Sequence, residues 1–153
     1  MKIGDRLLLL GGGLTAAASL LHVAIIIGGP DWYRFFGAGE RMARLAAAGS
    51  IYPAVVTAGI AFVLGIWTLY ALSGAGLIRR LPFLRLALVL IAAIYLIRGI
   101  LGIPLVLFAD DPYSNQLKAR MTFMVISSLI CIGIGICYAV GASFVFRRLP
   151  SRS

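Results

Sequence analysis

The sequence predicts an all-α integral membrane protein, a four-helix bundle that forms one transmembrane domain over residues 1–153. Two observations support this fold class. Hydrophobic residues make up 61% of the chain and charged residues 12%, whereas soluble domains have about 45–50% and about 25%. Four apolar stretches are also long enough to cross a hydrocarbon core, which takes about 20 helical residues. This composition excludes a soluble globular domain and a disordered chain.

The predicted spans are residues 7–28, 52–72, 86–108 and 121–146. Only the third span contains a charged residue, Arg98. The first stretch has small residues at positions 15–19, as a signal peptide has before its cleavage site. Because the apolar run continues well beyond them, we expect this segment to be retained as a span.

The distribution of Lys and Arg predicts that both termini face the cytoplasm. Basic residues flanking spans collect on the cytoplasmic side of a membrane. Eight lie on the side of the termini, and five lie on the other side: Lys2, Arg6, Arg79, Arg80, Arg85, Arg147, Arg148 and Arg152 against Arg34, Arg41, Arg44, Lys118 and Arg120. We therefore expect a multi-pass protein of the cell inner membrane.

The net charge of +9 has the same explanation. Positive flanks set topology and contact anionic membrane lipids. Binding of nucleic acid would require a basic patch interleaved with aromatic residues on a soluble surface, and the sequence has none. The expected contacts of the charged flanks are therefore membrane lipids, with no nucleic-acid partner.

The connection between the first two spans is predicted to contain a short helix in the outer membrane interface. Gly28-Gly29-Pro30 ends the first span, and Asp31 can cap a new helix. The aromatic residues that follow, beginning with Trp32 and Tyr33, make the segment too apolar for a solvated loop and too short to span. Glu40 then begins a further helical turn. The segment is either a bilayer anchor or a lid at the edge of the bundle.

Arg98 is the most informative residue of the spans. It lies ten positions before Phe108, or about 15 Å below the outer edge, which is the bilayer midplane. A charge there costs about 2.5–3.5 kcal/mol on insertion scales, so it should face the bundle interior and have a partner. A structural ion pair, bonds to backbone carbonyls and the binding of an anion all remain open. Glu40 is the expected partner if the outer connection dips inward.

His22 and Cys131 are the other reactive side chains near this depth. His22 is the only histidine, and it shares a weakly polar helical face with Thr15, Ala18 and Ser19. Cys131 lies ten positions into the fourth span, near the expected depth of Arg98. His22 is either a packing residue or a proton-handling or ligand-binding group. Cys131 is either a small buried residue or a thiol activated by Arg98.

These residues predict a pocket that opens outward. Arg98 would be its floor, and its walls and rim would come from different segments: His22, Tyr95, Cys131 and Ser127 for the walls, and Asp31, Trp32, Tyr33 and Glu40 for the rim. The second outer loop carries Asp110 and Asp111, but one carboxylate pair does not make a metal site, and no metal or cofactor is expected.

The chain shows two resemblances, the first implied over most of its length and the second over about 14 residues. The run from His22 to Gly49 resembles small four-helix bacterial inner-membrane proteins of uncharacterised function, which implies the fold but no activity. Glu40-Arg41 followed by Ile51-Tyr52-Pro53 is similar to the start of the second helix in the membrane-associated eicosanoid and glutathione metabolism family. That resemblance implies a trimer that binds glutathione. Residues 47–50 are Ala, Ala, Gly and Ser where that family has Asn and Glu, so its glutathione ligands do not carry over.

The function expected from the sequence is non-enzymatic. The outward pocket would bind an anionic or amphipathic ligand, or stripes of small residues would bind a partner membrane protein or a second copy of the chain. The first alternative is an enzyme acting on a lipid or thiol, with Arg98 holding an anion and His22 or Cys131 reacting. The second alternative is a subunit of a transporter, which would need oligomerisation to build a polar path.

Overall fold

The computed structural model describes residues 2–108 and 121–148, and the described chain is helical throughout except for short connections. Four long helices are α1 (Ile3–Gly28), α4 (Tyr52–Gly74), α5 (Leu84–Phe108) and α7 (Met121–Arg148). Each is long and apolar enough to cross a membrane. The predicted all-α fold with four long apolar helices is therefore confirmed within the described residues. The turn with Asp110 and Asp111 lies outside the described residues.

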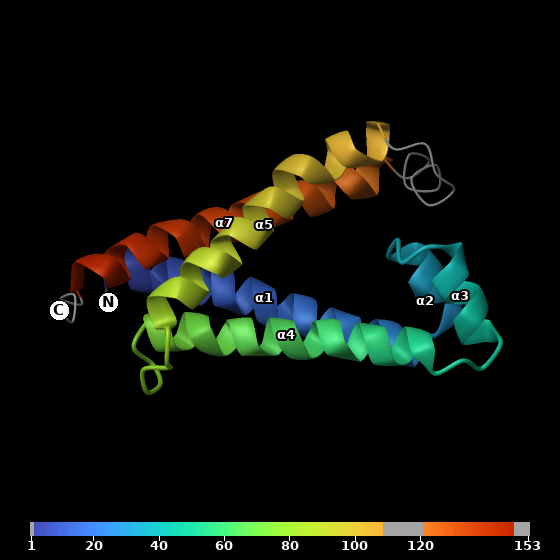
Figure 1. Ribbon diagram of the computed structural model, residues 1–153, viewed down its shortest axis with the longest axis horizontal. Coiled ribbons are helices and arrows are strands. Elements are labelled where there is room, and N and C mark those ends of the chain that lie inside the picture. Colours follow the sequence, from blue (N-terminus) through green and yellow to red (C-terminus); the bar gives the residue numbers. More distant parts are fainter. Residues whose placement is uncertain (1, 109–120, 149–153) are drawn as a thin grey trace.

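The four long helices form two pairs. α1 packs along α4 and α5 packs along α7, while α1 and α7 join the two pairs. Figure 1 shows the start of α1, the end of α7 and the α4–α5 turn at one end of the molecule, which we call the terminal end. The pairs meet there and diverge toward the other end, the distal end, where α2 (Pro30–Phe35) and α3 (Glu40–Ala47) lie.

The main hydrophobic core lies in the terminal halves of the helices. Its buried members come from all four long helices: Leu8, Leu64, Ala71, Leu84, Leu88, Ile91, Ala92, Tyr95, Ile134, Tyr138, Ala142 and Val145. In α1 the core reaches Ala18, which packs against it in part. Beyond that level the described parts of the two pairs no longer share this core, so the pairs pack together at the terminal end and lie apart toward the distal end (Figure 1).

Small residues set the close contacts between the long helices. A Cβ atom at Gly99 would lie 2.6 Å from Cγ1 of Ile132 and 2.9 Å from the carbonyl oxygen of Ser128, so α5 approaches the backbone of α7 there. A Cβ atom at Gly12 would lie 2.7 Å from that of Ala71, which places α1 against α4. Membrane helices associate by such close approach because lipid supplies no hydrophobic driving force between them.

The predicted short helix after the first span is present, as two helices that fold over the end of α1. Tyr33 of α2 and Ala43 of α3 are buried against Ile25 of α1. The reversal between α2 and α3 requires positive φ angles, 76° at Gly37 and 93° at Gly39, which glycine adopts without steric cost. The hairpin thus has a small apolar core of its own and packs against α1 and α4.

Candidate functional site

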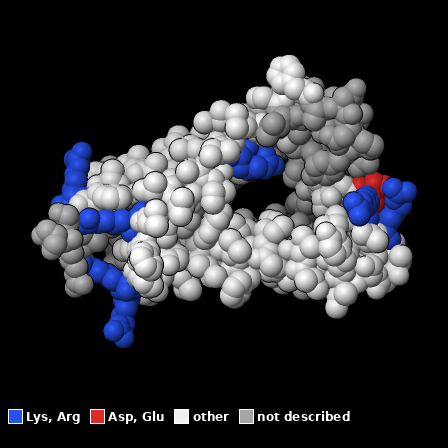
Figure 2. Space-filling model, in the orientation of Figure 1, with Lys and Arg blue, Asp and Glu red and all other residues white. Residues whose placement is uncertain are grey.

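The space between the two helix pairs is the candidate site, and we call it the inter-pair opening. In the space-filling view of Figure 2 it is a gap that passes through the molecule between the pairs. Basic atoms border the gap near the middle of the molecule, well away from the charged groups at either end. Its closed side is a buried polar network, and its walls are the distal halves of the long helices.

The closed side of the opening is formed by three hydroxyl groups. Thr15 of α1 is fully buried, and its Oγ1 lies 3.2 Å from the hydroxyl of Tyr95 and 3.3 Å from that of Tyr138. Thr15 itself donates to the carbonyl oxygen of Gly11 at 2.8 Å. The Tyr138 hydroxyl also lies 3.2 Å from the carbonyl oxygen of Trp67, which ties α7 to α4. One threonine thus links α1 to both helices of the other pair.

Arg98 extends from this network toward the distal end. It lies three positions after Tyr95, so the two residues are neighbours on one helical face. Its Nη1 packs against Gly102, one helical turn further along α5, at the place where a Cβ atom of a larger residue would lie. The side chain is exposed, and its guanidinium forms no hydrogen bond or ion pair within the described part of the chain. The predicted bonds to carbonyls are therefore not seen there.

A buried hydroxyl group without a partner lies next to this guanidinium. Ser128 of α7 is 1% exposed, and its Oγ has no hydrogen-bond partner among the described residues. The same Oγ is 3.3 Å from the position that a Cβ atom would take at Gly102, against which Arg98 also packs. A hydroxyl and a guanidinium are both donors suited to an anion.

Cys131 and Ser127, two residues of the predicted wall, have different surroundings. Cys131, one turn after Ser128, packs at the edge of the main core and lies within electrostatic range of Arg98. Ser127 donates to the carbonyl oxygen of Met124 at 3.1 Å, within its own helix. Its neighbour Ser128 therefore supplies the hydroxyl beside Arg98. A shift of one residue rotates a side chain by about 100° around a helix, so the sequence alone did not distinguish them.

His22 lies on the opposite wall of the opening. It is seven positions after Thr15 and four after Ala18, both of which face the interior, so it continues the same face of α1. Its Nδ1 is 2.7 Å from the carbonyl oxygen of Ala18 and must be the donor, because a carbonyl only accepts. Nε2 is the ring nitrogen that this hydrogen bond leaves unused. The described residues show no bond between His22 and Arg98 or Cys131.

The ion pair predicted between Glu40 and Arg98 is wrong. Both carboxylate oxygens of Glu40 bind the guanidinium of Arg34, at 3.0 and 3.2 Å. Asp31 binds the same guanidinium at 2.9 Å. Asp31 and Arg34 are one helical turn apart, and the reversal at Gly37 and Gly39 returns Glu40 to α2. Local geometry thus gives both acidic residues a partner on their own hairpin.

Three of the predicted rim residues, Asp31, Trp32 and Tyr33, have different surroundings. Trp32 and Asp31 line a surface pocket of about 400 Å³ on α2 together with Phe35 and Phe36. The Trp32 ring covers Gly28, which has no room for a Cβ atom. Tyr33 points the other way and is 2% exposed in the hairpin core. Tyr33 is therefore a packing residue, and the exposed aromatic surface of the hairpin belongs to the residues around it.

No protein family, curated protein or solved structure matches this chain.

The site brings together some of the residues singled out from the sequence and separates others. Tyr95, Arg98 and Cys131 lie on one wall, and His22 lies on the other wall. Asp31 and Glu40 bind Arg34 at the distal end. Among the described residues, no three His, Cys, Asp or Glu side chains gather to hold a metal ion. The sequence analysis missed Tyr138 and Ser128. Their hydroxyl groups within an apolar span were the available signal, because such groups seek partners inside the bundle.

Acidification is expected to loosen the α2–α3 hairpin. The hydrogen bonds from Arg34 lower the pKa of Glu40 below its ordinary value of 4.5. The pair therefore contributes fully to hairpin stability above that value, and the contribution is lost as pH falls through the lowered pKa. The fluorescence of Trp32, in a Trp67→Phe background, reports this change between about pH 7 and about pH 3. Glu40→Gln should remove the pH response, and a response that persists in this variant would assign it to another group.

Proposed function

We propose that the protein binds an anionic amphipathic molecule, such as a fatty acid or an anionic phospholipid, in the inter-pair opening. The acidic head of the ligand would bind Arg98 and Ser128, and its apolar part would lie along the apolar distal halves of the helix pairs. No nucleophile and base stand within hydrogen-bond reach of each other in the described structure, so binding rather than catalysis accounts best for these groups.

One observation supports this proposal above all others. Arg98 is a charge in the middle of a span, and the described residues offer it no hydrogen bond or ion pair. A charge at this depth is costly without a partner, and we propose that this partner is a ligand from outside the chain. The buried hydroxyl of Ser128 beside it, which has no hydrogen-bond partner among the described residues, supports the same proposal. An oxyanion would satisfy both donors at once.

We infer that the opening faces away from the cytoplasm. The terminal end carries the larger share of Lys and Arg, and the positive-inside rule places that end in the cytoplasm of a bacterial inner membrane. Helices α2 and α3, with exposed Trp32 and Phe35, would then lie in the outer interface, where aromatic side chains are favoured. A ligand would enter between the helix pairs from the bilayer or from that interface.

Replacement of Arg98 by leucine should weaken ligand binding without unfolding the protein. The variant removes a charge that has no partner in the described chain, so its melting temperature without ligand should be unchanged or higher. Loss of a charge-assisted hydrogen bond is worth about 1.5–3 kcal/mol, which is about tenfold or more in affinity. Native mass spectrometry of the purified protein with oleate or phosphatidylglycerol, and with phosphatidylcholine as the neutral comparison, measures the bound fraction.

Arg44→Gln is the matched control because Arg44 is an exposed arginine of α3, outside the inter-pair opening. It should bind both anionic probes as the unmodified protein does. Equal loss in both variants would mean that charge in general, and not this site, attracts the probes. A specific dimer that retains no lipid and depends on Arg98 would instead favour binding of a second copy of the chain, and it would overturn the proposal.

A further inference from the structure

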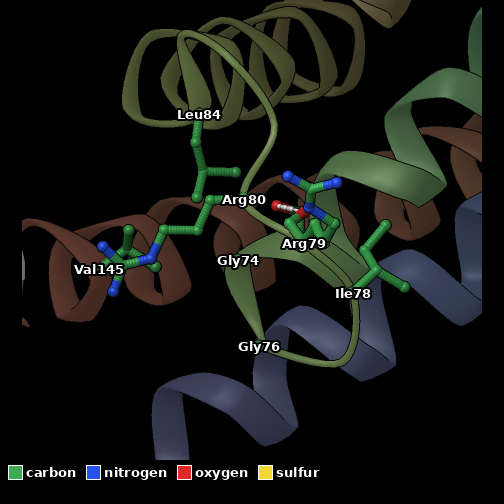
Figure 3. A pocket seen from close by; sticks show the side chains of 8 residues that line it. Gly74, Gly76, Ile78, Arg79, Arg80, Leu84 and Val145 are labelled. Atoms are coloured by element: carbon green, nitrogen blue, oxygen red, sulfur yellow. Dashed lines mark hydrogen bonds between the residues drawn. The ribbon is translucent and has the colours of Figure 1, made fainter.

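A second polar pocket lies at the terminal end, far from the inter-pair opening. It has a volume of about 390 Å³ and is lined by the end of α4, the turn that follows and the first residue of α5, with Val145 of α7 on one side. Figure 3 shows the side chains of Arg79 and Arg80 on two sides of it, with Arg80 on the side of Val145 and Arg79 on the side of Ile78. The pocket is thus basic on two sides and apolar at its border.

The turn that carries these arginines is fixed by one serine. Ser73 is 3% exposed, and its hydroxyl donates to the carbonyl oxygen of Arg79 and accepts from the amide of Leu81, each at 3.0 Å. The hydroxyl of Tyr70 also donates to the carbonyl oxygen of Pro82 at 3.2 Å. These bonds hold the backbone on both sides of Arg80, so the two guanidinium groups project from a defined turn rather than from a free loop.

No carboxylate neutralises the pocket within the described structure. The ion pairs seen among the described residues are those of Arg34, at the distal end. Asp5, the acidic residue of the terminal end, is buried and accepts a hydrogen bond from the backbone amide of Lys2 at 2.9 Å. Arg85, next to Leu84 of the lining, adds a third positive charge over the Phe146 ring, and its buried Nη2 has no hydrogen-bond partner among the described residues.

The surroundings of the pocket are those of a membrane interface. Phe83 is 80% exposed and Leu77 is 57% exposed, although both lie in a turn beside two arginines. Large exposed apolar side chains next to basic ones are typical of a segment that inserts into the headgroup region. A ligand in this pocket would therefore have its acidic group at headgroup depth and apolar surface beside it.

We propose that this pocket binds a phosphate monoester or diester, with Arg79 and Arg80 contacting different oxygens of the same phosphate. Guanidinium groups bind phosphate through paired, parallel N–H···O bonds, and two of them on different sides of a pocket fit a tetrahedral anion with several oxygens. The phosphate belongs either to an anionic phospholipid of the surrounding leaflet or to a soluble organic phosphate. This site is independent of the inter-pair opening and of the function proposed for Arg98.

The test compares the double variant R79Q/R80Q with R6Q/R147Q, which loses two exposed charges at the same end. Full-length protein in nanodiscs of phosphatidylcholine is titrated with phosphatidylglycerol, and retained lipid is counted by native mass spectrometry. We expect binding to weaken about tenfold in R79Q/R80Q and less than about twofold in R6Q/R147Q. Equal weakening in both would show a general surface charge effect, and no weakening in either would also overturn the proposal.

Further arms identify the source of the phosphate and guard against misfolding. In detergent without lipid, a rise in melting temperature with glycerol phosphate or inorganic phosphate, lost in R79Q/R80Q, would assign the site to a soluble phosphate. A response to phosphatidylglycerol alone would assign it to lipid. R79K/R80K keeps both charges but not the paired geometry, so it should retain a normal melting temperature and lose part of the binding. Full binding by this variant would contradict the proposed paired bonds.

Discussion

Replacement of Gly99 by valine is expected to destabilise the protein more than any other single change considered for this bundle. A Cβ atom there would lie 2.9 Å from the carbonyl oxygen of Ser128 and 3.0 Å from the amide nitrogen of Ile132. Both are backbone atoms of α7 and cannot rotate away, so α5 and α7 must separate. Overpacking of this kind costs about 1–3 kcal/mol and occasionally more.

The free energy of unfolding, measured by titration with a denaturing detergent in mixed micelles, checks this prediction. Gly133→Val is the control, because Gly133 is an exposed helical glycine of α7 with no atom within 4 Å of its Cβ position. We expect it to change stability by less than about 0.5 kcal/mol, as exposed substitutions usually do. Gly99→Ala provides an intermediate case if the valine variant does not accumulate. Equal effects at the two glycines would show that α5 and α7 do not pack as described.

Replacement of Thr15 by valine should give the second large effect. The change keeps the shape of a fully buried side chain but removes the hydroxyl group that Tyr95 and Tyr138 contact. Tyr138 retains the carbonyl oxygen of Trp67, whereas Tyr95 loses the only partner that the described structure gives its hydroxyl. A buried donor without a partner costs about 1–3 kcal/mol, although measured interhelical bonds in membranes average less.

A double-mutant cycle separates the hydrogen bond from the packing around it. Tyr95→Phe removes the stranded donor, so Thr15→Val should cost less in that background than in the unmodified protein. Thr68→Val is the control, because the Thr68 hydroxyl donates to Leu64 within its own helix at 3.0 Å and reaches Gly12 of α1 only at 3.5 Å. Additive effects of Thr15→Val and Tyr95→Phe on the free energy of unfolding would mean that the two hydroxyl groups do not interact.

The same network positions the candidate site. Tyr95 precedes Arg98 by three residues, and its bond to Thr15 fixes the face of α5 that is turned toward α1. Loss of that bond should therefore also weaken the ligand binding that we propose at Arg98, even though Thr15 need not touch the ligand. The contact at Gly99 has a similar role, because it sets Ser128 of α7 next to the residues of α5.

Particular residues show which part of the site could be predicted. Arg98 was identifiable from the sequence because a charge inside an apolar span has few explanations. The expected pairing of Arg98 with Glu40 was wrong. Glu40 lies in a hairpin whose reversal at two glycines brings it to Arg34 instead. Ser128 was missed for a related reason. Ser127 and Ser128 cannot be distinguished from the sequence. Only the contact between α5 and α7 shows that Ser128 is the one that faces Arg98.

The sequence by itself determined the helices. In a bilayer every span must satisfy its own backbone hydrogen bonds, so a long apolar stretch is a helix whatever surrounds it. The predicted ends at residues 28 and 52 agree with the observed ends, while α1 begins at residue 3, four residues before the predicted start at residue 7. Only the tertiary structure decided how the helices pair, where the pairs diverge and which side chains border the opening. Small residues occur in all four spans, and since lipid is as apolar as the helices, close backbone contacts such as those at Gly12 and Gly99 decide the pairing.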